Sequence, residues 1–373
     1  MQDAARDEPG AGPLDDDDCE DAEKIPVTTT TTRNALITTQ LGPCESYPHR
    51  VKVSVVGVSN VGMACAIAIL MRRTASEVCL VDKDKERARA EAEDIQHAGV
   101  FLGCPLVVGG SDISSVKDST VVVVSVNEPR PGEKPDVAKN LEIFRTIVPG
   151  IVKFACRAVL VIATPPVEVM SYIAWKFSKL CRNRVLGVGT LVDSVRFQSL
   201  VGRRLGLAPS AVHCTSIGAQ GVNSVPVWSG LHVAGTRLRD VNPKMGEDDD
   251  PEGWQDVAKE VAETQARLDE RMGDRGPSCW ALGFCAAEIV DAVVRNTKVV
   301  LPVATYVHSC SHGTDKDVFM SVPCVVCREG VHCTLRQKLT DSEKSAVQTC
   351  ADNIRGVLRE SGIFQDVQEE AEF

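Results

Sequence analysis

The feature that most constrains the fold of this chain is a short glycine turn between an apolar strand and an apolar helix. The β-branched stretch VKVSVVG (51–57) precedes the turn, and the apolar stretch Val61–Arg73 follows it. A second strand-like run, VCLVD, covers 78–82, and further runs typical of buried strands lie at Val121–Val126 and Val159–Ala163. Strands that alternate with helices predict an α/β fold, with a parallel sheet covered on both faces.

The turn itself has the layout of a dinucleotide-binding site. It reads Gly57-Val-Ser59-Asn-Val-Gly62, and Asp82 ends the next strand twenty residues after Gly62. Such a turn places a pyrophosphate at the helix N-terminus, and an acid at that distance binds the ribose hydroxyls. An Asp in this place favours NAD over NADP. Ser59 stands where the pattern has its middle glycine and is expected to crowd the phosphates; the alternative is a Rossmann-type fold that binds its nucleotide poorly.

Charge and composition exclude several classes of protein. The net charge of −10 comes mostly from residues 1–24, where ten acidic side chains face only two basic ones, so the remaining chain is nearly neutral. A neutral body lacks the basic stripe that nucleic-acid binding requires. No apolar run approaches the ~18 residues of a membrane-spanning helix. The acidic N-terminus argues against a secretory or transit signal, so we expect a cytoplasmic protein with its 15 cysteines reduced.

The chain is expected to contain a tail and two domains. An acidic, Thr-rich N-terminal tail without a core of its own covers 1–47. A Rossmann-type NAD-binding domain covers 48–188, and a mixed α+β substrate domain covers 189–373, because the strand–helix rhythm changes near residue 190.

Two local patterns stand out in the second half. Stretches near 299–308 and 318–326 are expected to pair antiparallel, and Thr340-Asp-Ser-Glu343 is a capping box that predicts a helix start. Cysteines and histidines between His308 and Cys333 invite a zinc interpretation, but their spacing is imperfect, so we predict no metal site.

From about residue 51 to the C-terminus the chain resembles vertebrate-type L-lactate dehydrogenases. The resemblance is carried by GMACAIAIL (62–70), SYIAWK (171–176), DSVRF (193–197), SVPVWSG (224–230) and DVFMSVPC (317–324). It implies an NAD-binding domain followed by a lactate/malate dehydrogenase-type substrate domain, and usually a tetramer. It also implies the family reaction, in which lactate and NAD give pyruvate and NADH.

The resemblance assigns site residues one position at a time. It makes Asp193 the group that orients the catalytic histidine and Arg196 the group that binds the substrate carboxylate, on one face of a helix. The family's Gly-Glu-His-Gly reads Gly-Ala-Gln220-Gly here, and an amide cannot shuttle a proton at neutral pH. Asp193 is then expected to bond Gln220 or Arg196. His213 lies seven residues upstream and is expected to be a core or structural histidine.

The loop that closes over substrate in the family is about three residues shorter in this chain and reads NEPRPGEKPDVAKN (127–140). Arg130 matches the family's cofactor-contacting Arg. The carbonyl-polarising Arg has become Lys134 or Pro135, depending on where the gap falls. Lys keeps the charge but loses the planar fork of Arg, and the prolines are expected to stiffen the loop.

Two further positions of the family's site have changed. Pro165 replaces an Asn whose side chain contacts substrate and cofactor, so a hydrogen-bonding group is lost. Ser278 replaces a Thr, which is a mild change.

Three hypotheses follow. The first is a lactate dehydrogenase-like protein that keeps the fold, and with it NAD and carboxylate binding, but has little or no turnover. In this case the chain assembles with itself or with lactate dehydrogenase-type subunits. The second is a working NAD-dependent 2-hydroxyacid dehydrogenase whose proton comes from a relocated acid, or from water held by Gln220 and Asp193. The third is an interaction subunit that acts through its acidic tail.

Overall fold

The computed structural model describes residues 51–126, 133, 135–307 and 318–363. The chain divides into two compact units, Met1–Pro48 and His49–Phe373, and the description below concerns the second. The predicted tail, Arg130, Lys134 and the His308–His312 segment lie outside the described residues.

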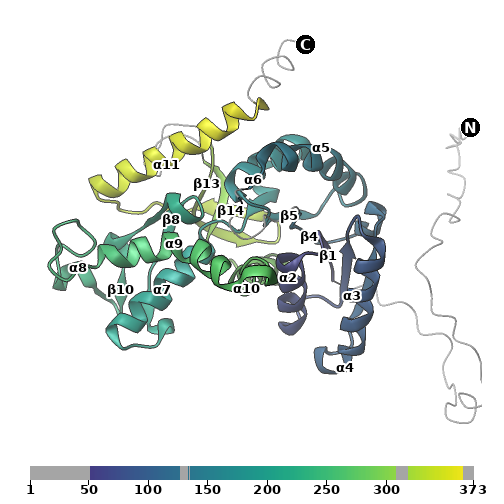
Figure 1. Cartoon of the computed structure of the whole chain (residues 1–373), viewed down its shortest axis with the longest axis horizontal. Helices are drawn as coiled ribbons and strands as arrows, with labels where there is room; N and C mark the ends of the chain where they lie inside the picture. The colour runs from purple at the N-terminus through teal and green to yellow at the C-terminus, as the bar shows by residue number, and fades with distance from the viewer. Residues whose placement is uncertain (1–50, 127–132, 134, 308–317, 364–373) are drawn as a thin grey trace, which may run out of the picture. The chain divides into compact units, whose positions relative to one another are not determined.

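The first half of this unit forms the predicted parallel sheet, which confirms the α/β fold class (Figure 1). Six neighbouring strands run in the order β3-β2-β1-β4-β5-β6, and each pairs parallel with the next. Their bounds are Lys52–Val56 (β1), Glu77–Val81 (β2), Leu106–Gly110 (β3), Val121–Val124 (β4), Val159–Ile162 (β5) and Val185–Gly187 (β6). The central strands are buried valine-rich runs, as expected for a sheet covered on both faces.

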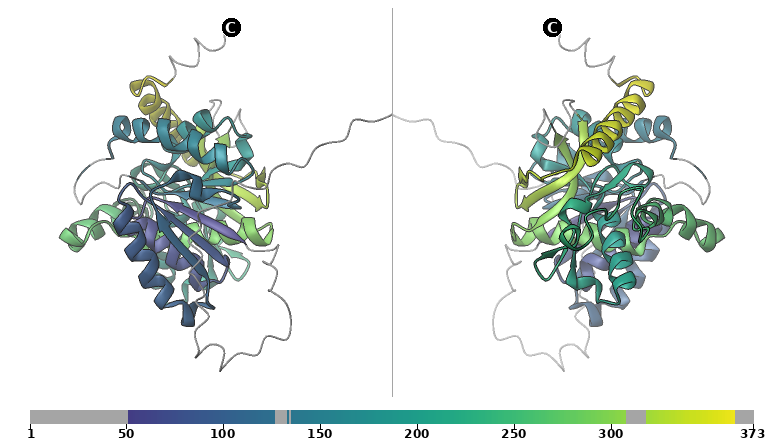
Figure 2. Two further views of the ribbon diagram at one scale, coloured as in Figure 1. Left: turned by 90° about the vertical axis from the view of Figure 1, so that its right-hand side faces the viewer. Right: turned by 90° about the vertical axis from the view of Figure 1, so that its left-hand side faces the viewer.

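Helices cover the two faces of this sheet (Figure 2). α2 and α10 pack together over β4, while α5 and α6 pack together on the other face. A Cβ on Gly283 of α10 would lie 2.6 Å from the backbone of Ala64 in α2, so the two helices approach as closely as glycine allows. The bounds are Asn60–Met71 (α2), Lys85–His97 (α3), Gly99–Leu102 (α4), Val137–Phe154 (α5), Val167–Ser178 (α6) and Trp280–Arg295 (α10).

The sheet continues without a break into the second half of the chain. β6 pairs antiparallel with β12, and the order then runs β12-β13-β8-β9, with β14 also paired to β13. The predicted antiparallel pair is confirmed, because β12 and β13 are opposed with Tyr306 facing Phe319. The bounds are Val212–His213 (β7), Ser216–Gly218 (β8), Ser224–Pro226 (β9), Val300–Val307 (β12), Val318–Cys327 (β13) and Gly330–Thr334 (β14).

The remaining elements of the second half lie around this extension. A small sheet of order β11-β10-β7 adds His232–Val233 (β10) and Thr236–Arg237 (β11). The helices are Leu191–Leu205 (α7), Leu238–Val241 (α8), Gln255–Met272 (α9) and Asp341–Glu360 (α11). Short 3₁₀ turns cover Ile113–Val116, Arg182–Arg184, Pro209–Ala211, Gly221–Asn223, Trp228–Gly230 and Gly273–Arg275.

The last helix, α11, begins where the sequence predicts. The Thr340 hydroxyl accepts a hydrogen bond from the Glu343 amide, and the Glu343 carboxylate accepts one from the Thr340 amide, which completes the capping box. Val347, Ile354 and Leu358 are buried and pack into the main core. The helix contacts β13 and β8.

In the described part of the chain no single helix has the length and apolarity needed to cross a bilayer. Only the bent pair formed by Gln255–Arg275 and Trp280–Arg295 meets those criteria, and only when both arms are counted together. The same residues contain no group of three or more His, Cys, Asp or Glu side chains placed to hold a metal ion.

Candidate active site

The glycine turn lies where the sequence places it, between β1 and α2. Gly57 has a φ of +101°, and a Cβ there would lie 1.8 Å from the Ser125 carbonyl oxygen. A Cβ on Gly62 would lie 1.9 Å from the Gly57 carbonyl oxygen. Both positions therefore require glycine, and the turn keeps the tight geometry that brings a helix N-terminus close to a pyrophosphate.

Asp82 closes this turn from the end of β2. Its Oδ2 accepts a hydrogen bond of 2.7 Å from the Val58 amide, and its Oδ1 accepts one of 3.0 Å from the Asp84 amide. Each carboxylate oxygen has a second lone pair, so Asp82 retains acceptors for ribose hydroxyls. Ser59 is the N-cap of α2 with extended backbone angles, a conformation that any residue adopts, so the change from glycine puts no strain on the backbone.

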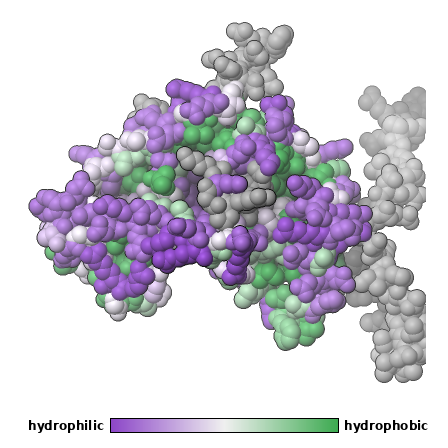
Figure 3. Space-filling view, viewed as in Figure 1, coloured by the Kyte–Doolittle hydropathy of each residue, from purple (hydrophilic) through white to green (hydrophobic). Residues whose placement is uncertain are grey.

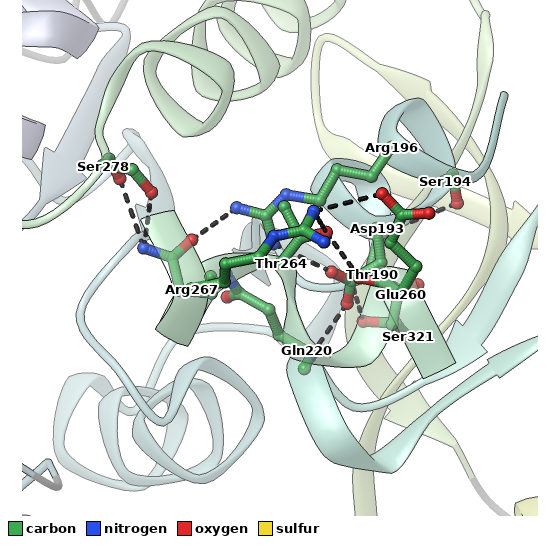
Figure 4. Close-up of polar contacts among 12 residues, drawn as sticks. Thr190, Asp193, Ser194, Arg196, Gln220, Glu260, Thr264, Arg267, Ser278 and Ser321 are labelled. Atoms are coloured by element: carbon green, nitrogen blue, oxygen red, sulfur yellow. Dashed lines mark hydrogen bonds and ion pairs between the residues drawn. The ribbon is translucent and has the colours of Figure 1, made fainter. Parts of the chain in front are cut away.

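The second group of site residues lies on α7. Asp193 is fully buried in the first turn of that helix, and Arg196 Nη1 lies 3.3 Å from Asp193 Oδ1 (Figure 4). This contact is the predicted i, i+3 pair on one helix face. Asp193 Oδ2 also accepts a hydrogen bond of 2.9 Å from the Gly221 amide. Asp193 thus bonds Arg196, one of its two predicted partners. Its other hydrogen bond within the described residues comes from the Gly221 amide and not from Gln220.

Gln220 lies between two buried carboxylates. Its backbone amide donates to Glu168 Oε1 over 3.2 Å, and the next amide, that of Gly221, donates to Asp193. The Gln220 carboxamide forms no hydrogen bond within the described residues. The position that the resemblance gives to the catalytic histidine is therefore fixed through its backbone by two acids.

Glu168 is the acid that sequence reasoning did not assign. It lies in the first turn of α6, where it accepts a hydrogen bond of 2.9 Å from the Ser321 hydroxyl in addition to that from Gln220. Burial raises the pKa of Glu168 to about 7, and these donors offset only part of that effect. Burial likewise raises the pKa of Asp193 to about 6, even though the Gly221 amide and Arg196 favour its charged form.

Glu168→Gln is expected to flatten the pH dependence of stability. The pKa of about 7 in the folded chain exceeds the ordinary value of 4.5, so folding binds a proton between these values. The stability that the protonated Glu168 carboxyl group contributes is full below pH 4.5 and is lost as pH rises through about 7. A glutamine oxygen can accept the same two hydrogen bonds without a charge. We expect the Tm of Glu168→Gln to exceed that of the wild type at pH 8, and we expect this difference to disappear at pH 5. Exposed Glu86→Gln is the control, and an equal pH slope in all three proteins would contradict the assignment.

Ser278 joins the site through a residue that the sequence did not indicate. Gln265 of α9 donates from Nε2 to the Ser278 hydroxyl over 2.7 Å, and its Oε1 accepts a hydrogen bond from Arg196 Nη2. Figure 4 shows Arg196 between Asp193 on one side and Ser278 on the other. Asp193, Arg196, Gln220 and Ser278 are thus brought together, although Ser278 reaches Arg196 only through this glutamine.

The remaining residues considered in the sequence analysis are His213, Pro165, Arg130 and Lys134. Of the two expectations for His213, a core position is wrong, because its side chain is exposed on β7 of the small second sheet. Its ring stacks on that of His232, with centroids 5.0 Å apart. Pro165 lies at the end of β5, and its carbonyl accepts a hydrogen bond of 2.9 Å from the Asn140 side chain. Arg130 and Lys134 are outside the described residues, so their roles stay predictions.

Comparison with known protein families accounts for this arrangement. The lactate/malate dehydrogenase NAD-binding domain matches residues 51–187, and the α/β C-terminal domain of the same family matches 190–363. The chain belongs to the lactate/malate dehydrogenase family. It is 40% identical over 319 residues to the L-lactate dehydrogenase A chain of Eleginops maclovinus, covering 85% of this chain and 95% of the relative. It is 38% identical to that of Sceloporus undulatus, with the same two coverages, and 38% identical to that of Columba livia over 84% and 94%.

This member of the lactate/malate dehydrogenase family is an NAD-binding protein, and its cofactor turn fits the group. The Gly57 and Gly62 positions leave no room for a Cβ, the first turn of α2 has no acidic side chain, and Asp82 is oriented by the Val58 amide. A helix N-terminus free of negative charge suits a pyrophosphate.

Proposed function

We propose that this chain is an L-lactate dehydrogenase-like protein whose catalysis is impaired at one step. It binds NAD(H), keeps Asp193 and Arg196 of the substrate site, and lacks the group that moves the proton. The observation that carries the proposal is Gln220, which stands between Asp193 and Glu168 where the resemblance expects a histidine. Its assignment to pyruvate metabolism rests on the same resemblance, and its place in the cytoplasm stays a prediction from the sequence.

The missing step follows from the proton balance of the family reaction. NADH, when bound, supplies the hydride that reduces the 2-oxo carbon of pyruvate. The carbonyl oxygen then needs one proton, and in the reverse direction the lactate hydroxyl must lose one. A carboxamide has no titratable proton near neutral pH, so Gln220 can polarise that oxygen but cannot exchange its proton. Asp193 is left to hold Arg196 and the Gly221 amide.

Self-assembly is part of the proposal. Val100 and Phe101 on α4 are 78% and 83% exposed, and an apolar area covers this helix (Figure 3). Exposed apolar side chains that lie together are typical of interaction surfaces. This supports assembly with a second copy or with a lactate dehydrogenase-type subunit. That the acidic tail binds a partner remains a prediction.

A second candidate, an active 2-hydroxyacid dehydrogenase, is favoured by Glu168. This carboxyl group lies one hydrogen bond from the Gln220 backbone, and burial raises its pKa to about 7, near the value that suits a general acid or base. Because the Glu168 carboxyl group is buried, a proton would have to reach the substrate through water beside Gln220.

Two measurements on the wild-type protein test the proposal. An NADH titration followed by fluorescence should saturate, and Asp82→Ala should weaken it because the ribose acceptors are lost. The same protein mixed with NADH and pyruvate should oxidise NADH ~10²–10⁴-fold more slowly than an enzyme that has its general acid. Turnover at the rate of a lactate dehydrogenase A chain would overturn the proposal and favour Glu168.

A further inference from the structure

The guanidinium of Arg196 already bonds two groups of this chain, one through each terminal nitrogen. Its side chain is only 9% exposed, Nη1 lies 3.3 Å from Asp193 Oδ1, and Nη2 donates to Gln265 Oε1. A carboxylate is bound best by two parallel N–H groups of the guanidinium fork. Because Nη2 bonds an amide oxygen and Nη1 an acid, a carboxylate that approached these N–H groups would have to displace a partner.

Gln265 is held in this position from its other end. Its Nε2 donates to Asp269 Oδ1 and Oδ2 over 2.9 Å and 3.0 Å, and to the Ser278 hydroxyl over 2.7 Å. Asp269 in turn accepts a hydrogen bond of 2.7 Å from the Ser278 amide. The amide thus bridges a cation at its oxygen and an anion at its nitrogen, so its orientation is fixed before any ligand arrives.

The charges around Gln265 also disfavour an anion. Asp193 already compensates Arg196, and Asp269 lies one side chain further along the same chain of hydrogen bonds. A small carboxylate in place of the Gln265 amide would meet Arg196, whose charge is already compensated. Such a ligand would lie between the carboxylates of Asp193 and Asp269. It would also break a hydrogen bond to a charged group, and such bonds are the strong ones.

We propose that the Gln265 carboxamide occupies the carboxylate position on Arg196 and is the specificity-determining residue that weakens the binding of small 2-oxo and 2-hydroxy acids. This inference rests on the proposed function, because Arg196 is taken as the inherited carboxylate-binding group. Gln265 supplies the planar oxygen that a substrate carboxylate would otherwise present. Removing it frees Nη2 and leaves a space beside Ser278 for the ligand.

Oxamate is a suitable probe, since it has the shape and charge of pyruvate but no readily reducible ketone. Its binding is measured by calorimetry, with and without saturating NADH, to wild type, Gln265→Ala and Gln265→Ser. We expect both variants to bind oxamate ~10–100-fold more tightly than wild type, the factor of one charged hydrogen bond that no longer has to be displaced. Gln265→Glu should show no binding, because its carboxylate pairs with Arg196 permanently.

Gln255→Ala is the matched control, since Gln255 lies at the start of the same helix and makes no hydrogen bond with Arg196. It should bind oxamate as the wild type does. The inference is overturned if folded Gln265→Ala and Gln265→Ser bind oxamate no more tightly than wild type. The NADH titration is read separately, so a failure of cofactor binding would contradict the proposed function while the oxamate comparison in the apo protein still decides the role of Gln265.

Discussion

Gln220→His is expected to raise the kcat for NADH-dependent reduction of pyruvate by ~10²–10⁴-fold over wild type, the range that general acid catalysis contributes. The new imidazole would stand beside Asp193, which already accepts a hydrogen bond from the amide of the following residue. A buried carboxylate in that place can accept from the ring N–H and orient the other nitrogen toward the substrate oxygen. The measurement is steady-state NADH oxidation over a range of pyruvate concentrations.

Gln220→Asn is the control, because it keeps an amide and gains no titratable group. We expect it to remain as slow as wild type, whereas Gln220→His should acquire a pH dependence set by an imidazole with a pKa near ~6.5. The effect should fall on kcat, and adding Gln265→Ala should mainly lower the KM. Equal rates for His and Asn at position 220 would contradict the proposed function.

Asp193→Ala is expected to lower the free energy of unfolding by about 3–5 kcal/mol, because it leaves a largely buried cation without its acid. Among the residues that the structure describes, Arg196 would keep only Gln265 as a partner, and the Gly221 amide would lose its acceptor. The measurement is denaturant unfolding near pH 7. Asp193→Asn keeps an oxygen for the same donors and should cost clearly less.

The double variant Asp193→Ala with Arg196→Met separates the pair from its surroundings. If the cost comes from the unpaired guanidinium, the double variant should be more stable than the sum of the two single losses predicts. Additive losses, or equal losses for Ala and Asn at position 193, would mean that the ion pair does not stabilise this site.

Much of the fold could be predicted from local sequence. The valine-rich runs at β1, β4 and β5, the apolar helix after the glycine turn and the capping box at Thr340 each depend on nearby residues alone. The parallel pairing followed from their alternation with helices. The pair of Asp193 and Arg196 was predictable for the same reason, since helical spacing brings them together.

The groups that surround Gln220 could not be found in this way. Gln265 and Asp269 lie in a polar segment of α9, AETQARLDE. Their approach to Arg196 depends on the packing of α9 against α7. Glu168 had one local signal, an acid within the apolar start of α6, but its partner Ser321 is distant in sequence. The exposure of His213 could not be read from nearby residues, because it depends on β7 being a two-residue strand of the small sheet.

The continuous sheet has a consequence for the synthesis and degradation of the chain. β6 belongs to the stretch matched by the NAD-binding model and β12 to the stretch matched by the C-terminal model, yet the two strands pair, and one buried cluster contains residues of both stretches. A fragment ending near residue 188 would present β6 as a bare, apolar edge open to other chains. Proteolysis or premature termination there would thus yield aggregation-prone material rather than an independent cofactor-binding module.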